Sequence, residues 1–411
     1  MSKEQARAQR DARIEAAIQL KTPDRVPFAP KIAEFPMRAY HISMYDAMMD
    51  ARNMTEGFRG YLQEYDPDAV FIDVLYGIPI LNALSPVHLN WPGPDGGLAL
   101  NDSWQHLDAT FLEDHEYKEF IQDPTHTILT KILPRKYKNL KGLSKLYLRE
   151  VYDALFFNDI AGLADPEVQA ALSALIAAGK AQNERNQQMG QIMACIEKEG
   201  YSTYNQGALV NPFDAFADCI RGIIRTVMDT MLFPAELNQA LTAVTEMNVE
   251  RLIQVYKAMG AKRIFLPLHC GVDEFMSPAA YEKFYWPHLK KTIMTIIEND
   301  MTPMVFCEGN YNSRLEIISD VPKGKVIYMF EKVDLQKAKD IVGKVACICG
   351  SVPTALLAFG TDQQIIDETR RQIEILAPGG GFIMDSSITV SNVSREKMSV
   401  WREATLKYGQ Y

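Results

Sequence analysis

The sequence lacks any long uninterrupted apolar run. None of its segments approaches the ~20 apolar residues that a membrane-spanning helix needs. The amino-terminal stretch MSKEQARAQRDARIEAAIQLK is charged and has no apolar core of the kind found in secretory signals. We therefore expect a cytoplasmic protein that does not enter a membrane.

Positive charge is also scarce. The chain carries 43 Lys and Arg against 52 Asp and Glu, which gives a formal net charge of −9. A phosphate-binding face needs clustered Lys and Arg, so we expect no nucleic acid as a main partner. The one basic stretch, residues 134–149, is interpreted as the solvated face of a helical insertion.

The six cysteines lack the CxxC spacing of a structural zinc finger. In a cytoplasmic chain they are expected to be buried thiols, metal ligands or catalytic groups rather than disulfides. Cys195, Cys219 and Cys270 are interpreted as small core residues. The other three, at 307, 347 and 349, stand at the ends of predicted strands, where a core role and a ligand role both stay open.

Strands and helices alternate clearly in the second half of the chain. Continuous apolar runs separated by helical patterns indicate a parallel sheet covered on both faces. With the αβ material before them, they favour an α/β fold of the (β/α)8 TIM-barrel type over an open sheet. We predict one domain over residues 1–411, with an amino-terminal helical extension at 1–66 and an irregular insertion at 104–165. The predicted strands are 67–77, 200–208, 263–270, 302–307, 325–331, 344–349 and 381–385.

The triple glycine in PGGGF, residues 378–382, resembles a phosphate-binding loop only in composition. Such a loop follows a strand and opens a helix. This one follows a predicted helix and precedes a predicted strand. It is therefore interpreted as a helix C-cap with a turn into the strand.

Polar side chains gather where the predicted strands end, which is where barrels of this kind place their reacting groups. Zinc prefers thiolate, imidazole and carboxylate ligands, and a catalytic zinc site uses three of them. From the residues alone, a zinc site and ordinary core packing remain alternatives. The strand-end residues with this chemistry are Asp73, His269, Cys307, Glu308, Glu331, Cys347 and Cys349.

Several stretches resemble the uroporphyrinogen decarboxylase superfamily, and the resemblance implies a (β/α)8 barrel with its active site at the strand C-termini. One branch of that superfamily decarboxylates uroporphyrinogen without metal, and another performs zinc-dependent methyl transfer to or from a corrinoid. The decarboxylases bind substrate carboxylates through an Arg-rich segment, whereas AEFPMRAYHIS (33–43) here has only Arg38. The similar stretches are KTPDRVPFAP (21–30), DAVFIDVLYGIPILNALSP (68–86), FMSPAAYEKFYWPHLKK (275–291), CEGNYNSRLE (307–316), ICGSVPTALLAFGT (348–361) and APGGGFIMDSS (377–387), with the closing KYG.

The sequence looks most like the methyltransferase components of anaerobic O-demethylases, which pass a methyl group from an aryl methyl ether to a separate corrinoid protein. In one subgroup an Asp and two Cys about 40 residues apart hold zinc, and Cys307 and Cys347 have that spacing. Ala279 stands at the Asp position. The resemblance thus implies zinc bound by the two cysteines, completed by His269 or Glu308.

The favoured hypothesis is a zinc-dependent methyltransferase that moves a methyl group from a small-molecule donor, with an aryl methyl ether preferred, to cob(I)alamin. Zinc would act as a Lewis acid on the ether oxygen. The corrinoid (cobalamin) would come from a corrinoid-binding partner protein, and a homo-oligomer is left open. The alternatives are a uroporphyrinogen decarboxylase-type carboxy-lyase and a non-catalytic barrel that binds a small molecule.

Three sets of residues follow from this hypothesis. Carboxyl and phenol groups at the strand ends are expected to donate a proton or orient the substrate. The catalytic set is Asp73, Glu308 and Tyr311; the substrate-binding set is Tyr76, Asn310, Arg314 and Glu331; and the metal set is His269, Cys307, Glu308 and Cys347.

Overall fold

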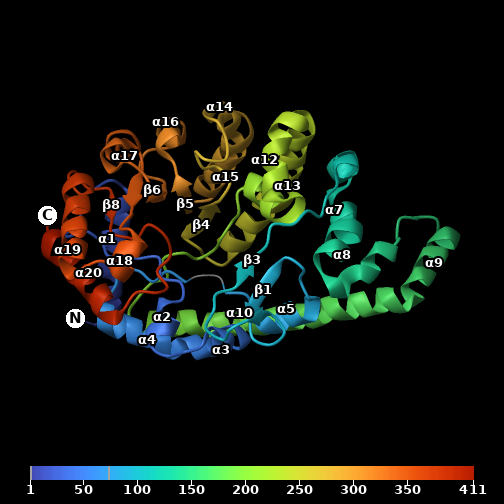
Figure 1. Cartoon of the computed structure of the whole chain (residues 1–411), viewed down its shortest axis with the longest axis horizontal. Helices are drawn as coiled ribbons and strands as arrows, with labels where there is room; N and C mark the ends of the chain where they lie inside the picture. Colours follow the sequence, from blue (N-terminus) through green and yellow to red (C-terminus); the bar gives the residue numbers. More distant parts are fainter. Residues whose placement is uncertain (1, 73–74) are drawn as a thin grey trace.

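The structure is a computed structural model that describes residues 2–72 and 75–411. Its main sheet has five parallel strands in the order β4-β5-β6-β7-β8, and helices lie between them along the chain (Figure 1). The apolar runs of the second half form this sheet because a strand covered on both faces needs apolar side chains on both. The strands are β4 (Arg263–Leu268), β5 (Thr302–Asn310), β6 (Ile327–Lys332), β7 (Cys347–Cys349) and β8 (Phe382–Ile383).

Three extended segments from the first half continue this sheet through single bridges. Phe28 pairs in parallel with Met384, just after β8. The carbonyl of Phe28 also accepts a hydrogen bond from Asp68 N at 2.8 Å. Further along, Val70 pairs with Thr203, and Ala208 pairs with Phe265 in β4. This mixed α/β arrangement with a parallel sheet is consistent with the predicted TIM-barrel-like fold.

The helices of the second half match the predicted alternation. The strands β7 and β8 are shorter than predicted. The helical segment from residue 212 to residue 232 is interrupted by a π-helical turn. The helices are α11 (Pro212–Phe216), η6 (Ala217–Arg221), α12 (Ile223–Leu232), α13 (Pro234–Ala258), α14 (Pro278–Ala280), η7 (Tyr281–Tyr285), α15 (Trp286–Glu298), η8 (Asn312–Arg314), α16 (Leu315–Ile318), α17 (Leu335–Ile341), η9 (Val342–Lys344), α18 (Thr354–Phe359), α19 (Asp362–Leu376) and α20 (Arg395–Tyr408).

The amino-terminal part is helical, as predicted. Helix is interrupted at Asp50, because Asp50 takes an extended conformation and its side chain caps the next turn by accepting a hydrogen bond from Arg52 N. The boundary of the amino-terminal extension at residue 66 stays a prediction. The elements are α1 (Lys3–Ile18), α2 (Phe35–Ala39), α3 (Met44–Met49), η1 (Ala51–Asn53), α4 (Met54–Tyr65), α5 (Ile78–Leu84) and the small strands β1 (Leu89–Pro92), β2 (Gly97–Leu98) and β3 (Gln105–His106).

The segment 104–165 was expected to be irregular, and this expectation is wrong, since most of it is helical. Residues 128–145 pack on the long helix α10 through a small separate core of Leu140, Leu143 and Ala171, whereas α6 packs on α13. Together with α9 and α10, residues 128–145 form an arm that extends away from the sheet (Figure 1). The elements are η2 (Asp114–Glu116), α6 (Tyr117–Gln122), α7 (Pro124–Thr127), η3 (Ile128–Ile132), α8 (Leu133–Lys136), η4 (Lys138–Lys145), α9 (Asp153–Ala161), η5 (Gly162–Ala164) and α10 (Pro166–Lys198).

No single helix in the described parts of the chain has the length and apolar composition to span a membrane. Residues 153–164 and α10 meet that test only as a pair, and the pair is bent by 78°.

The triple glycine forms the predicted turn between α19 and β8. Gly379, Gly380 and Gly381 all have positive φ, from 75° to 81°. A Cβ on Gly380 would stand 2.5 Å from the carbonyl oxygen of Lys21, so this position has no room for a side chain.

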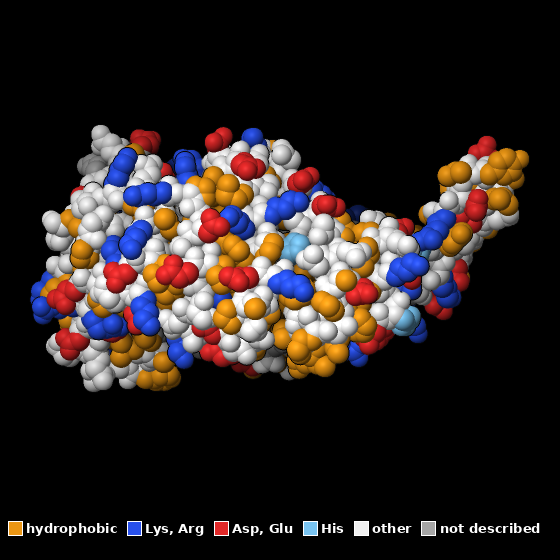
Figure 2. All heavy atoms as spheres, turned by 90° about the horizontal axis from the view of Figure 1, so that it is seen from above, with side chains coloured by type: hydrophobic (Ala, Val, Ile, Leu, Met, Phe, Trp, Pro, Cys, Tyr) orange, Lys and Arg blue, Asp and Glu red, His pale blue; other side chains and the backbone are white. Residues whose placement is uncertain are grey.

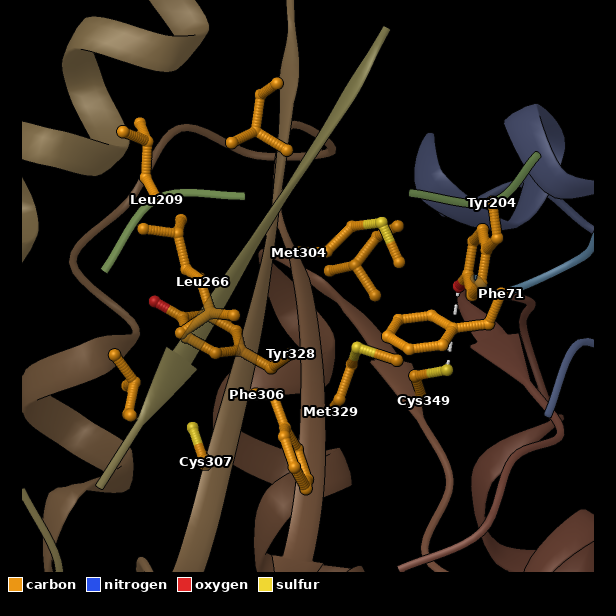
Figure 3. Packing of buried hydrophobic residues seen from close by; sticks show 14 of the residues in the cluster. Phe71, Tyr204, Leu209, Leu266, Met304, Phe306, Cys307, Tyr328, Met329 and Cys349 are labelled. Carbon is orange, nitrogen blue, oxygen red and sulfur yellow. Dashed lines mark hydrogen bonds between the residues drawn. The ribbon is translucent and has the colours of Figure 1, made fainter. Parts of the chain in front are cut away.

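Apolar side chains from several strands meet in a packed core (Figure 3). The Phe265 ring lies 5.1 Å from the Phe71 ring and 6.1 Å from the Phe306 ring, centroid to centroid. Met304 and Met329 fill the space beside Phe71 (Figure 3). With the core filled in this way, a ligand has to bind beyond it, at the ends of the strands.

Candidate active site at the strand ends

His269 stands at the centre of a polar cluster at the carboxyl ends of β4 and β5. It follows β4 directly, and its Nδ1 lies 2.6 Å from Asp218 Oδ2. On the other side of the ring, Nε2 lies 3.6 Å from Oε1 of Glu308 in β5. His269 and Glu308 keep 36% and 37% of their side-chain surface exposed, so a small molecule can reach both.

Asp218 and Asp214 come from the helical segment that follows residues 200–208. They are four residues apart, so both lie on the face that meets the end of β4. Asp214 is fully buried and accepts hydrogen bonds from Cys270 N at 2.8 Å and from the Tyr285 hydroxyl at 2.5 Å. Burial raises the pKa of the Asp214 carboxyl, partly offset by the nearby His269. Asp214 thereby fixes the backbone next to His269.

The charges in this cluster determine where protons reside. Burial alone would lower the pKa of His269, but the Asp218 hydrogen bond and the neighbouring carboxylates raise it to about 10. Burial raises the pKa of Glu308 to about 7, which the charge of His269 partly opposes. Near neutral pH the site therefore holds an imidazolium beside a carboxyl group that exchanges its proton readily.

Glu331 and Asn310 lie next to this cluster and shape its rim. Glu331 Oε2 accepts a hydrogen bond from Gly309 N at 2.6 Å, so it holds the backbone that follows Glu308. Asn310 turns its Oδ1 toward Asn312, whose backbone N donates to it at 3.1 Å. Both side chains are partly exposed and near the site, but each already has a structural partner.

Arg314 was expected to bind substrate, but its burial contradicts that role, and it forms an ion pair with Asp273 at 3.5 Å. Its side chain has no exposed surface, and its guanidinium donates to the carbonyls of Gly271 at 3.2 Å and Met276 at 2.5 Å. It also lies 4.7 Å over the Tyr281 ring. Arg314 therefore fixes the backbone of the loop after β4 through these hydrogen bonds. The residue type and its spacing in the sequence do not reveal this structural role.

Tyr311 lies in the same buried layer. It has no exposed surface, and a Cβ on Gly271 would come within 2.6 Å of its hydroxyl. Burial holds its pKa well above the usual value, so the phenol stays protonated. The structure places Tyr311 beneath the loop that carries His269, and not among the exposed groups of the cluster.

The predicted zinc ligands are not brought together. In the strand register Cys307 opposes Phe330, whereas Cys347 opposes Ile327, which in turn opposes Met304. Cys347 therefore sits three residues lower, about 10 Å along the strands, and two strands away. The spacing of about 40 residues between Cys307 and Cys347 led to the wrong prediction that the two thiols meet, because Cys347 stands at the start of β7 and not at its end.

Of the four predicted zinc ligands, only two lie close enough to share a metal ion. Cys307 and Cys347 have no exposed surface, and burial raises the pKa of both thiols. Only His269 and Glu308 approach each other. Within residues 2–72 and 75–411, no three His, Cys, Asp or Glu side chains are placed to hold a metal ion. The described donor set therefore does not fit the three-ligand zinc site.

A second polar group lies in the buried interior beside the sheet, and two of its members, Lys31 and Tyr204, were missed in the sequence. Lys31 forms an ion pair with Asp385, and the Cys349 Sγ lies 3.5 Å from Asp385 Oδ2. The Tyr204 hydroxyl lies 3.6 Å from the same Sγ (Figure 3). All four side chains are buried. Lys31 directly follows the KTPDRVPFAP stretch and carried no signal of its own in the sequence.

The other predicted residues have varied positions. Tyr76 is 37% exposed and packs edge-on against Trp104, with the ring centroids 4.8 Å apart. Asp73 lies outside the described residues. The expectation that Cys270 is buried is confirmed, whereas Cys219 is exposed and Cys195 is half-buried, so the core role is wrong for Cys219.

The chain belongs to the uroporphyrinogen decarboxylase family. The family profile described as Uroporphyrinogen decarboxylase (URO-D) matches residues 167–405, more than half of the chain. This range includes β4 to β8 and the cluster around His269. The superfamily predicted from the sequence is thereby confirmed. No match was found among curated protein sequences.

Among solved structures, the fold is similar to that of a methyltransferase from Methanosarcina mazei. The TM-score is 0.64 at 15% sequence identity, over 97% of this chain and 98% of that chain. At this identity the likeness concerns the fold. A B12-independent methionine synthase from Shewanella sp. W3-18-1 also matches, at 12% identity over 49% of this chain and 60% of that one. Its TM-score of 0.33 is too low to indicate a shared fold.

Proposed function

We propose that this protein is a methyltransferase that moves a methyl group from a small methylated substrate to a corrinoid carried by a partner protein. The observation that carries the proposal is the partly exposed pair His269 and Glu308, 3.6 Å apart at the ends of adjacent strands, with His269 held by Asp218. A closed (β/α)8 barrel, completed by the bridges at Phe28, Val70 and Ala208, belongs to the same proposal.

An aryl methyl ether is the preferred substrate class. Breaking the methyl–oxygen bond leaves negative charge on the oxygen, and the phenolate is a poor leaving group. The imidazolium of His269 would stabilise that charge, and Glu308 would donate its proton to the oxygen as the bond breaks. The corrinoid partner supplies the nucleophile that accepts the methyl group. Asp218 would hold the His269 ring in orientation.

Zinc has no step in this proposal. Of the predicted ligands only His269 and Glu308 lie near each other, and two donors fall short of a catalytic site. The proposal therefore rests on proton donation and charge stabilisation by side chains of this chain.

The carboxy-lyase alternative has less support. A substrate with many carboxylates needs several free cations in the mouth. Arg38 already pairs with Glu34 at 2.6 Å, and Lys31 is paired with Asp385. Arg314 is buried against backbone carbonyls. No observation favours the non-catalytic barrel over the methyltransferase, since the acid–base pair is exposed.

The test is methyl transfer to free cob(I)alamin from a panel of aryl methyl ethers, followed by the visible spectrum of the corrinoid. We expect turnover by the wild type and at least a 100-fold loss in Glu308→Gln and His269→Asn, the range for removing a proton donor. Glu316→Gln is the matched control, because Glu316 is exposed on α16 and outside the cluster. Equal rates in all four proteins, or no methyl transfer from any donor, would contradict the proposal.

A further inference from the structure

The outer end of the arm is unusually apolar. Helix α9 has no buried residue at all. Its Leu155, Phe157 and Ile160 are 48%, 65% and 39% exposed, and the preceding Val151 and Tyr152 are 95% and 69% exposed. Figure 2 shows hydrophobic side chains at the far end of the arm. We call these five residues the arm tip. A group of strongly exposed apolar side chains such as the arm tip is typical of interaction surfaces.

A second exposed apolar face lies on α12. Ile224, Met228, Met231 and Leu232 follow the i, i+4, i+7, i+8 spacing of one helix face, and they are 67%, 47%, 78% and 59% exposed. The opposite face of this helix is buried, and its Asp229 pairs with Arg221 at 2.7 Å. That buried ion pair holds α12 against the body of the protein. The four apolar residues, which we call the α12 face, therefore stay directed toward the solvent.

We propose that the arm tip of one copy docks on the α12 face of a second copy, and the reverse, in a two-fold symmetric dimer. One symmetry operation then covers both apolar faces of each chain. Helices α9 and α12 lie on the same side of α10, with α7 and α8 between them (Figure 1). Within one chain they cannot meet, since α10 is a continuous 33-residue helix that holds the tip away from the body.

The available area suits a dimer. A fully buried aromatic side chain covers about 150–250 Å², and the nine residues are on average more than half exposed. Together they offer on the order of 1,000 Å² per copy, while a stable interface needs about 800 Å² per partner. Each face alone falls short of that area, so docking of both faces is required.

The charges around the tip disfavour a membrane as the occupant. The two charged residues of α9, Asp153 and Asp159, are acidic, whereas interfacial helices that bind anionic lipid carry Lys and Arg. The basic residues just before it, Lys145 and Arg149, already pair with Asp165 at 3.0 Å and with Asp123 at 3.6 Å. A second copy of this chain needs no such charge, because the α12 face that it presents is apolar.

The test is sedimentation of the full chain over a concentration series. We expect a dimer for the wild type and at least tenfold weaker association for both Phe157→Glu and Met231→Glu, the effect of charging a central contact. Phe157→Glu combined with Met231→Lys restores association, since the new charges then meet across the interface. Ile176→Glu is the matched control, because Ile176 is 60% exposed on α10 outside both faces and should leave the dimer intact.

A cross-link distinguishes direct docking from a change in folding. In a Cys219→Ser background, which removes the exposed thiol, Phe157→Cys and Met231→Cys chains are mixed in equal amounts. The proposal expects disulfide-linked pairs only in the mixture. A monomer at every concentration, a dimer insensitive to both charged variants, or tip-dependent binding to anionic phosphatidylglycerol vesicles would overturn it.

Discussion

Lys31 and Asp385 form an ion pair that has no exposed side-chain surface and joins the first extended segment to the segment after β8. Lys31 N also donates to Asp385 Oδ1 at 2.6 Å, and Lys31 Nζ lies 4.8 Å from the centre of the Phe306 ring. The pair thus connects residues 354 positions apart. It holds the amino-terminal segment against the last strand.

We expect that removing one partner of this pair is strongly destabilising. Asp385→Asn or Lys31→Met leaves an uncompensated charge in the core, which costs about 3–5 kcal/mol. The measurement is the free energy of unfolding in urea. Lys31→Met combined with Asp385→Leu should cost less than either single change, because no buried charge remains. A double variant less stable than both single variants would contradict this account.

Gly271→Ala tests the packing beneath His269. The added methyl would stand 2.6 Å from the Tyr311 hydroxyl and 2.8 Å from Tyr285 Cε1, and both rings are fully buried. Overpacking of this kind costs about 1–3 kcal/mol. Tyr311→Phe removes one of the two clashes and should recover part of the lost stability in the double variant. An unchanged unfolding midpoint for Gly271→Ala would show that the loop can move freely.

The thiols are expected to matter for packing and not for metal binding. Cys307→Ala and Cys347→Ala should each lower stability by about 1 kcal/mol, since each removes a small buried group. Any zinc that the purified protein binds should be retained in both variants, measured by elemental analysis against the wild type. Loss of zinc in both variants together would restore the predicted two-cysteine site and require a different arrangement of β7.

The insertion should become less stable in acid through Glu116. The Arg135 hydrogen bond, against the opposing effect of burial, lowers the pKa of this carboxyl to about 2 from its usual 4.5. Because the folded value is depressed, the stabilisation is complete above pH 4.5 and is lost as the pH falls through 2. After allowance for the partly exposed Arg135, it amounts to on the order of 2 kcal/mol.

Glu116→Gln measures this contribution. We expect it to lower the free energy of unfolding at pH 7 and to have progressively less effect below pH 4.5. Glu119→Gln is a suitable control, since Glu119 contacts Lys131 at 2.5 Å but is 39% exposed, and exposed ion pairs contribute little. A Glu116→Gln effect that stays constant from pH 7 to pH 3 would contradict the ion-pair explanation.

Alternating apolar and helical patterns were enough to predict the parallel strands, because the strand period and the helix period leave different marks in the sequence. The same patterns could not give the register. Cys307 and Cys347 both belong to predicted strands, but whether a residue stands at the start or the end of β7 depends on pairing with β6. His269 and Glu308 were identified from their positions at strand ends, and their contact supports that reasoning.

Asp218 and Lys31 were missed for a different reason. Asp218 lies in η6, away from every predicted strand end, and only the fold brings it 2.6 Å from His269. Lys31 looked like an ordinary surface lysine, and its burial depends on a partner far away in the sequence. Long-range pairing of this kind leaves no local pattern.

The bridge between Phe28 and Met384 has a consequence for how the chain is made. During synthesis the segment around Phe28 emerges from the ribosome long before Met384 has been made. The hydrogen bond from Val26 N to the carbonyl of Gly409 can form only after that, when the end of the chain has been made. Contacts of such long sequence separation form slowly. The newborn chain therefore exposes unpaired, apolar strand edges until translation is nearly finished, which makes it a natural client for chaperones during that interval.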